Sequence, residues 1–254
     1  MKRATAEERA LARASLYRLL SLAFSYPTAE VHAQLEGAIE VARVGATLID
    51  DAAEKGVAAL AAALVDTGYR DLEGSYQTVF TLSYSEDCPP YETAFSASHI
   101  FQQTQHQADI SGFYRAFGVR PDGDRPDHLA TELEFGYLLA LKEARAREEG
   151  DRPGLDATRA AHRKFLGEHL ARWAPLAAGR VALGGGHAWH TSAAHLLTSF
   201  TAWDVRFLRL AKVDRYRDEP APPVQSEADG CPIDECPAPA APNLEMETSH
   251  VPAP

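Results

Sequence analysis

Apolar residues recur at intervals of three and four along most of this chain, and no stretch alternates long enough between apolar and polar residues to form a strand. Such intervals place side chains on one face of an α-helix, whereas strands need a period of two. The most regular example runs from Pro126 to about Glu149, with Leu129, Leu133 and Tyr137 on its apolar face. The sequence therefore predicts an all-α fold, a single-domain helical bundle.

Helix-breaking residues divide this pattern into segments. Pro27 and the pair Pro89 and Pro90 interrupt it because proline lacks a backbone donor, and Pro175 is expected to end a helix. Gly118 is expected to cap a helix in a left-handed conformation. We expect helices over residues 5–25, 29–43, 47–66, 69–82, 93–117, 126–149, 155–172 and 187–214.

Composition divides the chain of 254 residues into two parts. Residues 1–216 carry the helical pattern, and their number suits one domain with a sizeable core. The last 38 residues, 217–254, hold nine of the 16 prolines, eight acidic side chains and one basic one. Such a segment buries too little apolar surface to offset its chain entropy, so we expect a disordered, proline-rich acidic tail.

Charge and cysteine content exclude several classes of protein. The chain has 36 acidic and 25 basic side chains, and its net charge of -11 opposes binding to nucleic acid. The mean hydropathy of -0.28 and the short apolar runs predict no stable membrane insertion, and no export signal is visible before Arg18. Three cysteines are too few for a disulfide framework. Together these features predict a cytoplasmic protein.

Motifs for metal, nucleotide or nucleophilic chemistry are weak. Residues 184–186 are glycines without the lysine of a phosphate-binding loop. The pattern H-x2-H-x4-H that begins at His187 lacks the ligand set of a zinc site, and Cys231 and Cys236 lie in the tail without two further ligands. No Gly-x-Ser-x-Gly nucleophile elbow occurs. The residues alone give no support for catalysis, and we expect no cofactor and no metal.

Two short clusters remain. The first, Cys88-Pro89-Pro90-Tyr91-Glu92, is a rigid extended loop that presents an aromatic ring and a carboxylate. The second, Arg125-Pro126-Asp127-His128-Leu129-Ala130-Thr131-Glu132, places His128 and Glu132 one helical turn apart. Two interpretations stay open. Asp127 is either only favoured by the helix dipole, with His128 and Glu132 a weak surface pair, or these residues form a binding site.

In their order along the chain, the clusters resemble the TorD/DmsD/NarJ family of redox enzyme maturation chaperones, which assist molybdopterin enzymes of the dimethyl sulfoxide reductase family. The resemblance spans about residues 10–212. It rests on the Pro-Pro-Tyr-Glu loop, the Pro-Asp-His-x-x-x-Glu element, and aromatic-rich segments at 76–80, 113–119 and 165–173. Residues 88–117 are most similar to the subgroup that serves enzymes of the ethylbenzene dehydrogenase, dimethylsulfide dehydrogenase, selenate reductase and chlorate reductase type.

The resemblance implies an all-helical chaperone without catalysis of its own. Such a protein holds the catalytic molybdopterin subunit for cofactor insertion and folding before export, and often masks its twin-arginine signal peptide. The molybdenum cofactor belongs to that client, and the insertion machinery is a further expected partner. An apolar groove with nearby carboxylates would suit the basic, apolar signal peptide. The expected client-binding residues are Tyr76, Phe80, Leu82, Pro90, Tyr91, Glu92, Asp127, His128 and Glu132.

We expect Asp127 and His128 near an exposed helix start, so that alanine at either position weakens client binding with little loss of thermal stability. Two rival hypotheses remain: a metal-dependent enzyme using His128, Glu132 and the histidines at 187–195, and a nucleotide-regulated assembly factor. The identity of the client stays open, and so does the choice between a monomer and a domain-swapped dimer.

Overall fold

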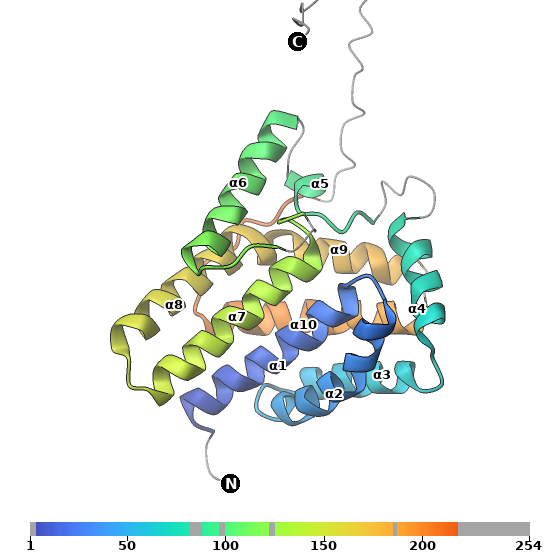
Figure 1. The fold of residues 1–254 in the computed structure, drawn as a ribbon, viewed down its shortest axis with the longest axis horizontal. Coiled ribbons are helices and arrows are strands. Elements are labelled where there is room, and N and C mark those ends of the chain that lie inside the picture. Colours follow the sequence, from blue (N-terminus) through green and yellow to red (C-terminus); the bar gives the residue numbers. More distant parts are fainter. Residues whose placement is uncertain (1–3, 82–87, 97–99, 122–124, 185–186, 218–254) are drawn as a thin grey trace, which may run out of the picture. The chain divides into compact units, whose positions relative to one another are not determined.

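The computed structural model describes residues 4–81, 88–96, 100–121, 125–184 and 187–217. Within these ranges every regular element is a helix, and the one β-type contact is an isolated bridge between Tyr91 and His128. The predicted all-α fold is confirmed (Figure 1). Leu82 and the expected tail beyond Arg217 lie outside the described residues, so the tail stays a prediction.

The order of the elements follows the predicted segments closely. Side-chain oxygens of Thr5, Thr28, Asp50 and Asp151 accept backbone N–H groups at the starts of their helices, as N-caps do. The elements are α1 (Ala6–Phe24), α2 (Ala29–Ala46), α3 (Asp51–Leu64), α4 (Tyr69–Tyr76), the π-helix η1 (Gln77–Thr81), α5 (Thr93–Ser96), α6 (Ile100–Ala116), α7 (Leu129–Glu148), α8 (Arg152–Phe165), the π-helix η2 (Leu166–Leu170), α9 (Ala171–Leu183) and α10 (Ala188–Phe207).

Helix α1 is the centre of the bundle. It packs against α7, α2 and α10, and most of its residues are buried. Figure 1 shows α7 running beside α1, while α10 passes behind them and contacts α3 and α9. Helices α1 and α7 lie close together at Gly136, where a Cβ atom would meet the ring of Tyr17. None of the described helices is long and apolar enough to cross a membrane.

A buried ionic network joins the helices at the core. The Arg13 guanidinium donates to Asp204 at 2.6 Å and to Glu143 at 2.7 Å, and the Tyr17 hydroxyl donates to Asp204 at 2.7 Å. Burial and the nearby Arg13 charge hold the pKa of His162 well below its usual value, so this ring is neutral. The network links α1, α7, α8 and α10, and this connection explains why charged residues interrupt otherwise apolar helix faces.

Two of the predicted helices differ from the observed ones, one because it is divided and one because it begins later. The segment expected at 93–117 is α5 followed by α6, which begins at Ile100. The helix expected from Pro126 begins at Leu129, because residues 126–128 instead pair with the loop before α5. Gly118 does cap α6 with a φ of 72°, and the Val119 N–H donates to the Tyr114 carbonyl at 3.0 Å in a Schellman motif.

The other differences concern the C-terminal helices. Pro175 lies inside α9 and does not end a helix; the π-helical turn η2 ends five residues before it. Helix α10 ends at Phe207, short of the expected residue 214. Arg209 just beyond has a φ of 56°, a left-handed conformation that a helix cannot contain.

Candidate functional site

The two clusters singled out in the sequence lie side by side. We call residues 88–93 and 125–128 the paired loops. Two backbone hydrogen bonds of 2.9 Å join them, from the Glu92 N–H to the Asp127 carbonyl and from the Leu129 N–H to the Pro90 carbonyl. Both loops therefore hold a fixed position relative to the start of α7.

Asp127 is the polar centre of the paired loops and is fully buried. Its carboxylate accepts hydrogen bonds from the Thr93 hydroxyl at 2.6 Å and the Thr93 N–H at 3.2 Å. Arg125 donates to both of its oxygens, at 2.8 and 3.0 Å, and also lies over the Tyr91 ring. The expectation of an exposed Asp127 is wrong, because the loop pairing turns its side chain inward.

His128 is the N-cap of α7 and is 6% exposed. Its Nδ1 accepts the Ala130 N–H at 3.2 Å, its Nε2 lies 3.3 Å from the Tyr76 hydroxyl, and its ring packs edge-on against Tyr91. The expected exposed helix start is wrong for this residue too. His128 therefore caps α7, and its ring contacts both Tyr91 of the other loop and Tyr76 of α4.

Glu92 is a fully buried carboxylate between two histidines. Its Oε2 lies 3.1 Å from His169 Nδ1 and 3.1 Å from His106 Nε2, and the Tyr216 hydroxyl donates to its Oε1 at 3.1 Å. Burial by itself would raise the pKa of Glu92, but His106 and His169 outweigh it and lower the pKa to about 2. Glu92 is therefore ionised at neutral pH.

Glu132 has the opposite character. It is fully buried on α7, and Trp173 Nε1 donates to its Oε2 at 3.0 Å. Burial and the nearby Glu92 charge raise the pKa of Glu132 well above its ordinary value. The raised pKa favours the protonated form of Glu132 beside the ionised Glu92, which avoids two adjacent buried charges. The interpretation of Glu132 as half of a surface pair with His128 is wrong, because both side chains are inside.

Tyr76 and Phe80 belong to a buried aromatic cluster with His190. Their ring centroids are 4.7 Å apart, and the His190 Nδ1 lies 2.7 Å from the Ser75 hydroxyl. Burial lowers the pKa of His190 to about 4. Tyr76, Phe80 and Pro90 are therefore buried, whereas Tyr91 is partly exposed and Leu82 lies outside the described residues.

The residues of the rival metal hypothesis are not brought together. His128 faces Tyr76, Glu132 faces Trp173, and His187 caps the start of α10. In the described ranges, the group of side chains that can hold a metal consists of Glu92, His106 and His169. Sequence reasoning missed both of these histidines because they lie on separate helices, and His169 is 77 positions from Glu92.

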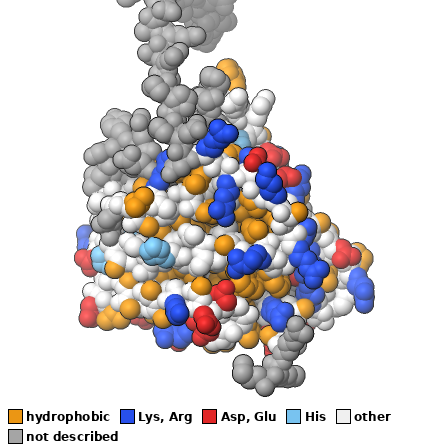
Figure 2. All heavy atoms as spheres, turned by 180° about the vertical axis from the view of Figure 1, so that it is seen from behind, with side chains coloured by type: hydrophobic (Ala, Val, Ile, Leu, Met, Phe, Trp, Pro, Cys, Tyr) orange, Lys and Arg blue, Asp and Glu red, His pale blue; other side chains and the backbone are white. Residues whose placement is uncertain are grey.

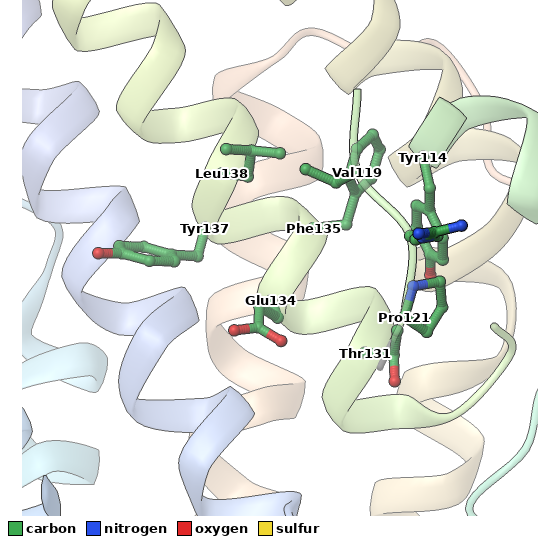
Figure 3. A pocket seen from close by; sticks show the side chains of 9 residues that line it. Tyr114, Val119, Pro121, Thr131, Glu134, Phe135, Tyr137 and Leu138 are labelled. Carbon is green, nitrogen blue, oxygen red and sulfur yellow. The ribbon is translucent and has the colours of Figure 1, made fainter. Parts of the chain in front are cut away.

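An apolar pocket of about 340 Å³ opens beside the first turns of α7. Figure 3 shows Glu134 and Tyr137 on the side of α7 nearer α1, with Tyr114 and Pro121 on the opposite side. The Tyr114 hydroxyl donates to the Pro126 carbonyl at 2.7 Å, so the pocket wall is tied to the paired loops. Tyr114, Val119, Arg120, Pro121, Thr131, Glu134, Phe135, Tyr137 and Leu138 line the pocket.

The face of the molecule behind Figure 1 is not uniformly acidic. Figure 2 shows lysine and arginine side chains spread among patches of hydrophobic atoms on that face, with fewer acidic side chains between them. The net charge of -11 therefore does not attract a basic partner equally to every surface of the helical part.

Known proteins match most of this helical part. Residues 47–178 match the family described as nitrate reductase delta subunit. The perchlorate reductase assembly chaperone protein of Dechloromonas aromatica (strain RCB) is 30% identical over 183 residues, which cover 68% of this chain and 80% of that protein. The selenate reductase assembly chaperone protein of Thauera selenatis is 42% identical over 70 residues, 26% of this chain and 35% of that protein.

A third relative shows the same pattern. The chlorate reductase assembly chaperone protein of Ideonella dechloratans is 40% identical over 70 residues, again 26% of this chain and 35% of that protein. All three relatives are named as chaperones of reductase assembly and none as a reductase. With more than half of its residues in the family match and a relative similar over most of both chains, this protein belongs to the nitrate reductase delta subunit family of NarJ- and TorD-like chaperones.

Proposed function

We propose that this protein is a cytoplasmic assembly chaperone that binds the catalytic subunit of a molybdopterin-containing reductase and holds it for cofactor insertion. The observation that carries the proposal is the similarity, over 68% of the chain, to a protein named for the assembly of perchlorate reductase. The names of the selenate and chlorate reductase chaperones favour a client of the same chemical class, an oxyanion reductase.

The client segment that we propose to be bound is its twin-arginine signal peptide. Such a peptide combines an apolar stretch with arginines and needs an apolar pocket beside a carboxylate. The pocket beside α7 has this combination, since Phe135 and Val119 line it and Glu134 lies at its edge. The Glu134 side chain is 61% exposed and 3.3 Å from Arg18, an exposed ion pair that a peptide arginine can replace at little cost.

The role we propose for the paired loops is to position this pocket. Pro90, Glu92, Asp127, His128 and Glu132 are buried and cannot bind a client while the loops are closed. Their hydrogen bonds hold the start of α7, from which Thr131, Glu134 and Phe135 reach the pocket. Tyr91 is only partly buried and is the predicted loop residue best placed to touch a client directly.

Affinity purification from the native cytoplasm, followed by mass spectrometry, tests the proposal. The baits are the wild type, Val119→Lys in the pocket and Val65→Lys as a matched control. Val119 is 38% exposed and Val65 is 67% exposed at the end of α3, so neither lysine has to enter the core. Thermal melts of the three purified baits check that each is folded.

We expect the wild type and Val65→Lys to retain a molybdopterin subunit that still carries its leader, and Val119→Lys to lose it. A wild-type bait that recovers no molybdopterin subunit contradicts the chaperone function. Recovery only of client without a leader contradicts signal-peptide binding. Equal recovery by Val119→Lys shows that the pocket is not the binding surface.

A further inference from the structure

Three side chains with metal-ligating atoms lie close together, and one of them belongs to the paired loops. Glu92 comes from the loop before α5, His106 from the middle of α6, and His169 from η2. One oxygen or nitrogen of each lies within 4.8 Å of the others. Two imidazoles and one carboxylate form a ligand set that binds zinc and other divalent first-row cations.

Two of the three distances among these atoms suit a shared ion. Zinc bonds to nitrogen and oxygen of about 2.0–2.1 Å at tetrahedral angles place neighbouring ligand atoms about 3.3 Å apart. Both His106 Nε2 and His169 Nδ1 lie 3.1 Å from Glu92 Oε2. His106 Nε2 is buried, yet it makes no hydrogen bond of acceptable geometry to that oxygen. The His106 nitrogen thus points past the Glu92 oxygen. This geometry is expected when both atoms bind the same metal ion.

The surroundings of the three side chains match those of metal ligands. Histidines that bind metals usually have their second ring nitrogen next to a carboxylate, which fixes the ring orientation. His169 Nε2 lies 3.4 Å from Asp109 Oδ2 on α6. The Tyr216 hydroxyl donates to the other oxygen of Glu92, which leaves Oε2 facing the histidines. Glu92 is thus held by a hydrogen bond from outside the ligand set, whereas His169 Nε2 lies near the Asp109 carboxylate without a hydrogen bond to it.

The site lies near the surface on the side of α6. Glu92 and His169 are buried, but the His106 side chain is 19% exposed and the Asp109 side chain is 64% exposed. Figure 1 shows the N-terminal end of α6 projecting beyond the other helices. The ligand atoms are buried, and His106 is the most exposed of the three side chains.

We propose that Glu92, His106 and His169 form a binding site for one divalent cation of the zinc class. The bound ion crosslinks the loop before α5, α6 and η2, and η2 is separated from α6 in sequence by α7 and α8. Its effect is to fasten α6 to the core and to stabilise the paired loops through Glu92. This site is distinct from the His128, Glu132 and 187–195 set of the rival enzyme hypothesis, and it implies no catalysis.

Zinc titration of the full-length chain tests the site. The parent protein carries Cys231→Ser and Cys236→Ser, so that the tail thiols cannot bind the ion, and is freed of metal with a chelator. Isothermal titration calorimetry gives the stoichiometry, and Co²⁺ added in place of Zn²⁺ gives a visible absorption band that reports tetrahedral nitrogen and oxygen ligands. His106→Gln is the test variant, because this ligand is partly exposed and its replacement does not open the core. His195→Gln, at an exposed position on α10, is the matched control.

We expect one zinc ion per chain in the parent and in His195→Gln, and at least tenfold weaker binding by His106→Gln. The thermal midpoint should rise with zinc in the first two proteins and stay unchanged in the third. Absence of stoichiometric zinc from the parent overturns the proposal, and so does unchanged affinity in His106→Gln. The titration needs no client, so its outcome is independent of the chaperone test.

Discussion

At the residue scale, the carboxylates that are expected to bind a client instead bind partners within the protein. Asp127 accepts three kinds of donor, the Thr93 hydroxyl, the Thr93 N–H and the Arg125 guanidinium. Glu132 accepts a hydrogen bond from Trp173, and burial and the charge of Glu92 raise its pKa. The Asp and Glu of the Pro-Asp-His-x-x-x-Glu element therefore have internal contacts, and a role of this element in client binding stays a prediction.

Replacing Asp127 with alanine should cost stability. The change leaves the buried Thr93 N–H without its acceptor and removes the partner of Arg125, so we expect a loss of about 2–3 kcal/mol in the free energy of unfolding. Urea unfolding measures this loss. Asp156→Ala, at an exposed position on α8, is the control and should change stability by less than about 0.5 kcal/mol. Equal stability of the two variants would restore the sequence-based expectation of an exposed Asp127.

Glu92 and Glu132 should give opposite dependences of stability on pH. The pKa of Glu92 is lowered from 4.5 to about 2, so its stabilising contribution is present above about pH 4.5 and is lost as the pH falls towards 2. The pKa of Glu132 is raised, so its contribution is present below about pH 4.5 and is lost as the pH rises through the folded-state pKa.

Glu132→Gln isolates the second of these contributions. Glutamine has the shape of the protonated carboxyl and can still accept the Trp173 N–H, but it cannot ionise. We therefore expect the variant to gain stability relative to the wild type as the pH rises from 4 to 8. Urea unfolding at a series of pH values measures the difference. A difference that does not change with pH would show that Glu132 is ionised in the folded protein.

Element boundaries depended on loop pairing and on close helix contacts. The apolar periodicity of α7 predicts its length and face, but Leu129 begins the helix because residues 126–128 bond to the loop before α5. Along α7, Gly136 allows a close contact with α1, since a Cβ atom there would lie 2.6 Å from Tyr17 Cε1. Tyr17 is fixed in turn by its 2.7 Å hydrogen bond to Asp204.

Gly136→Ala should separate α1 from α7. Because Tyr17 is buried and hydrogen-bonded, it cannot move aside without loss, and we expect the free energy of unfolding to fall by about 1–3 kcal/mol. Gly179→Ala on α9 is the control, since its added Cβ meets nothing within 4 Å. It should be neutral or stabilising by up to about 1 kcal/mol, because alanine favours helices. Chemical unfolding of both variants checks the contrast, and equal effects would contradict the close contact.

Charge is unevenly distributed over the whole molecule. Residues 217–254 hold eight acidic side chains and one basic one, so they account for most of the net charge of -11. Within the helical part, the buried Arg13 network joins four helices and leaves fewer charges to act on a partner. The general electrostatic argument for a basic partner is therefore weaker for the helical part than the total charge indicates.

The last described residues complete the helical part. The Tyr216 N–H donates to the Arg172 carbonyl at 3.1 Å, its hydroxyl donates to Glu92, and its ring lies against the Arg172 guanidinium. A chain of residues 1–217 should keep its thermal midpoint within about 2 °C, because it retains these contacts. A chain of residues 1–211 should melt about 3–6 °C lower. Thermal melts followed by circular dichroism measure both. A large loss in the longer chain would show that residues 218–254 contribute to folding.

The helical class, the approximate segments, the cap at Gly118 and the family were all determined by the sequence, because periodicity and ordered motifs are local properties of the chain. Only the tertiary structure decided that Asp127 and His128 are buried, and that Glu92 lies next to His106 and His169. These contacts join residues far apart along the chain. Helical periodicity shows which face of a helix is apolar, but it does not show which other segment covers that face.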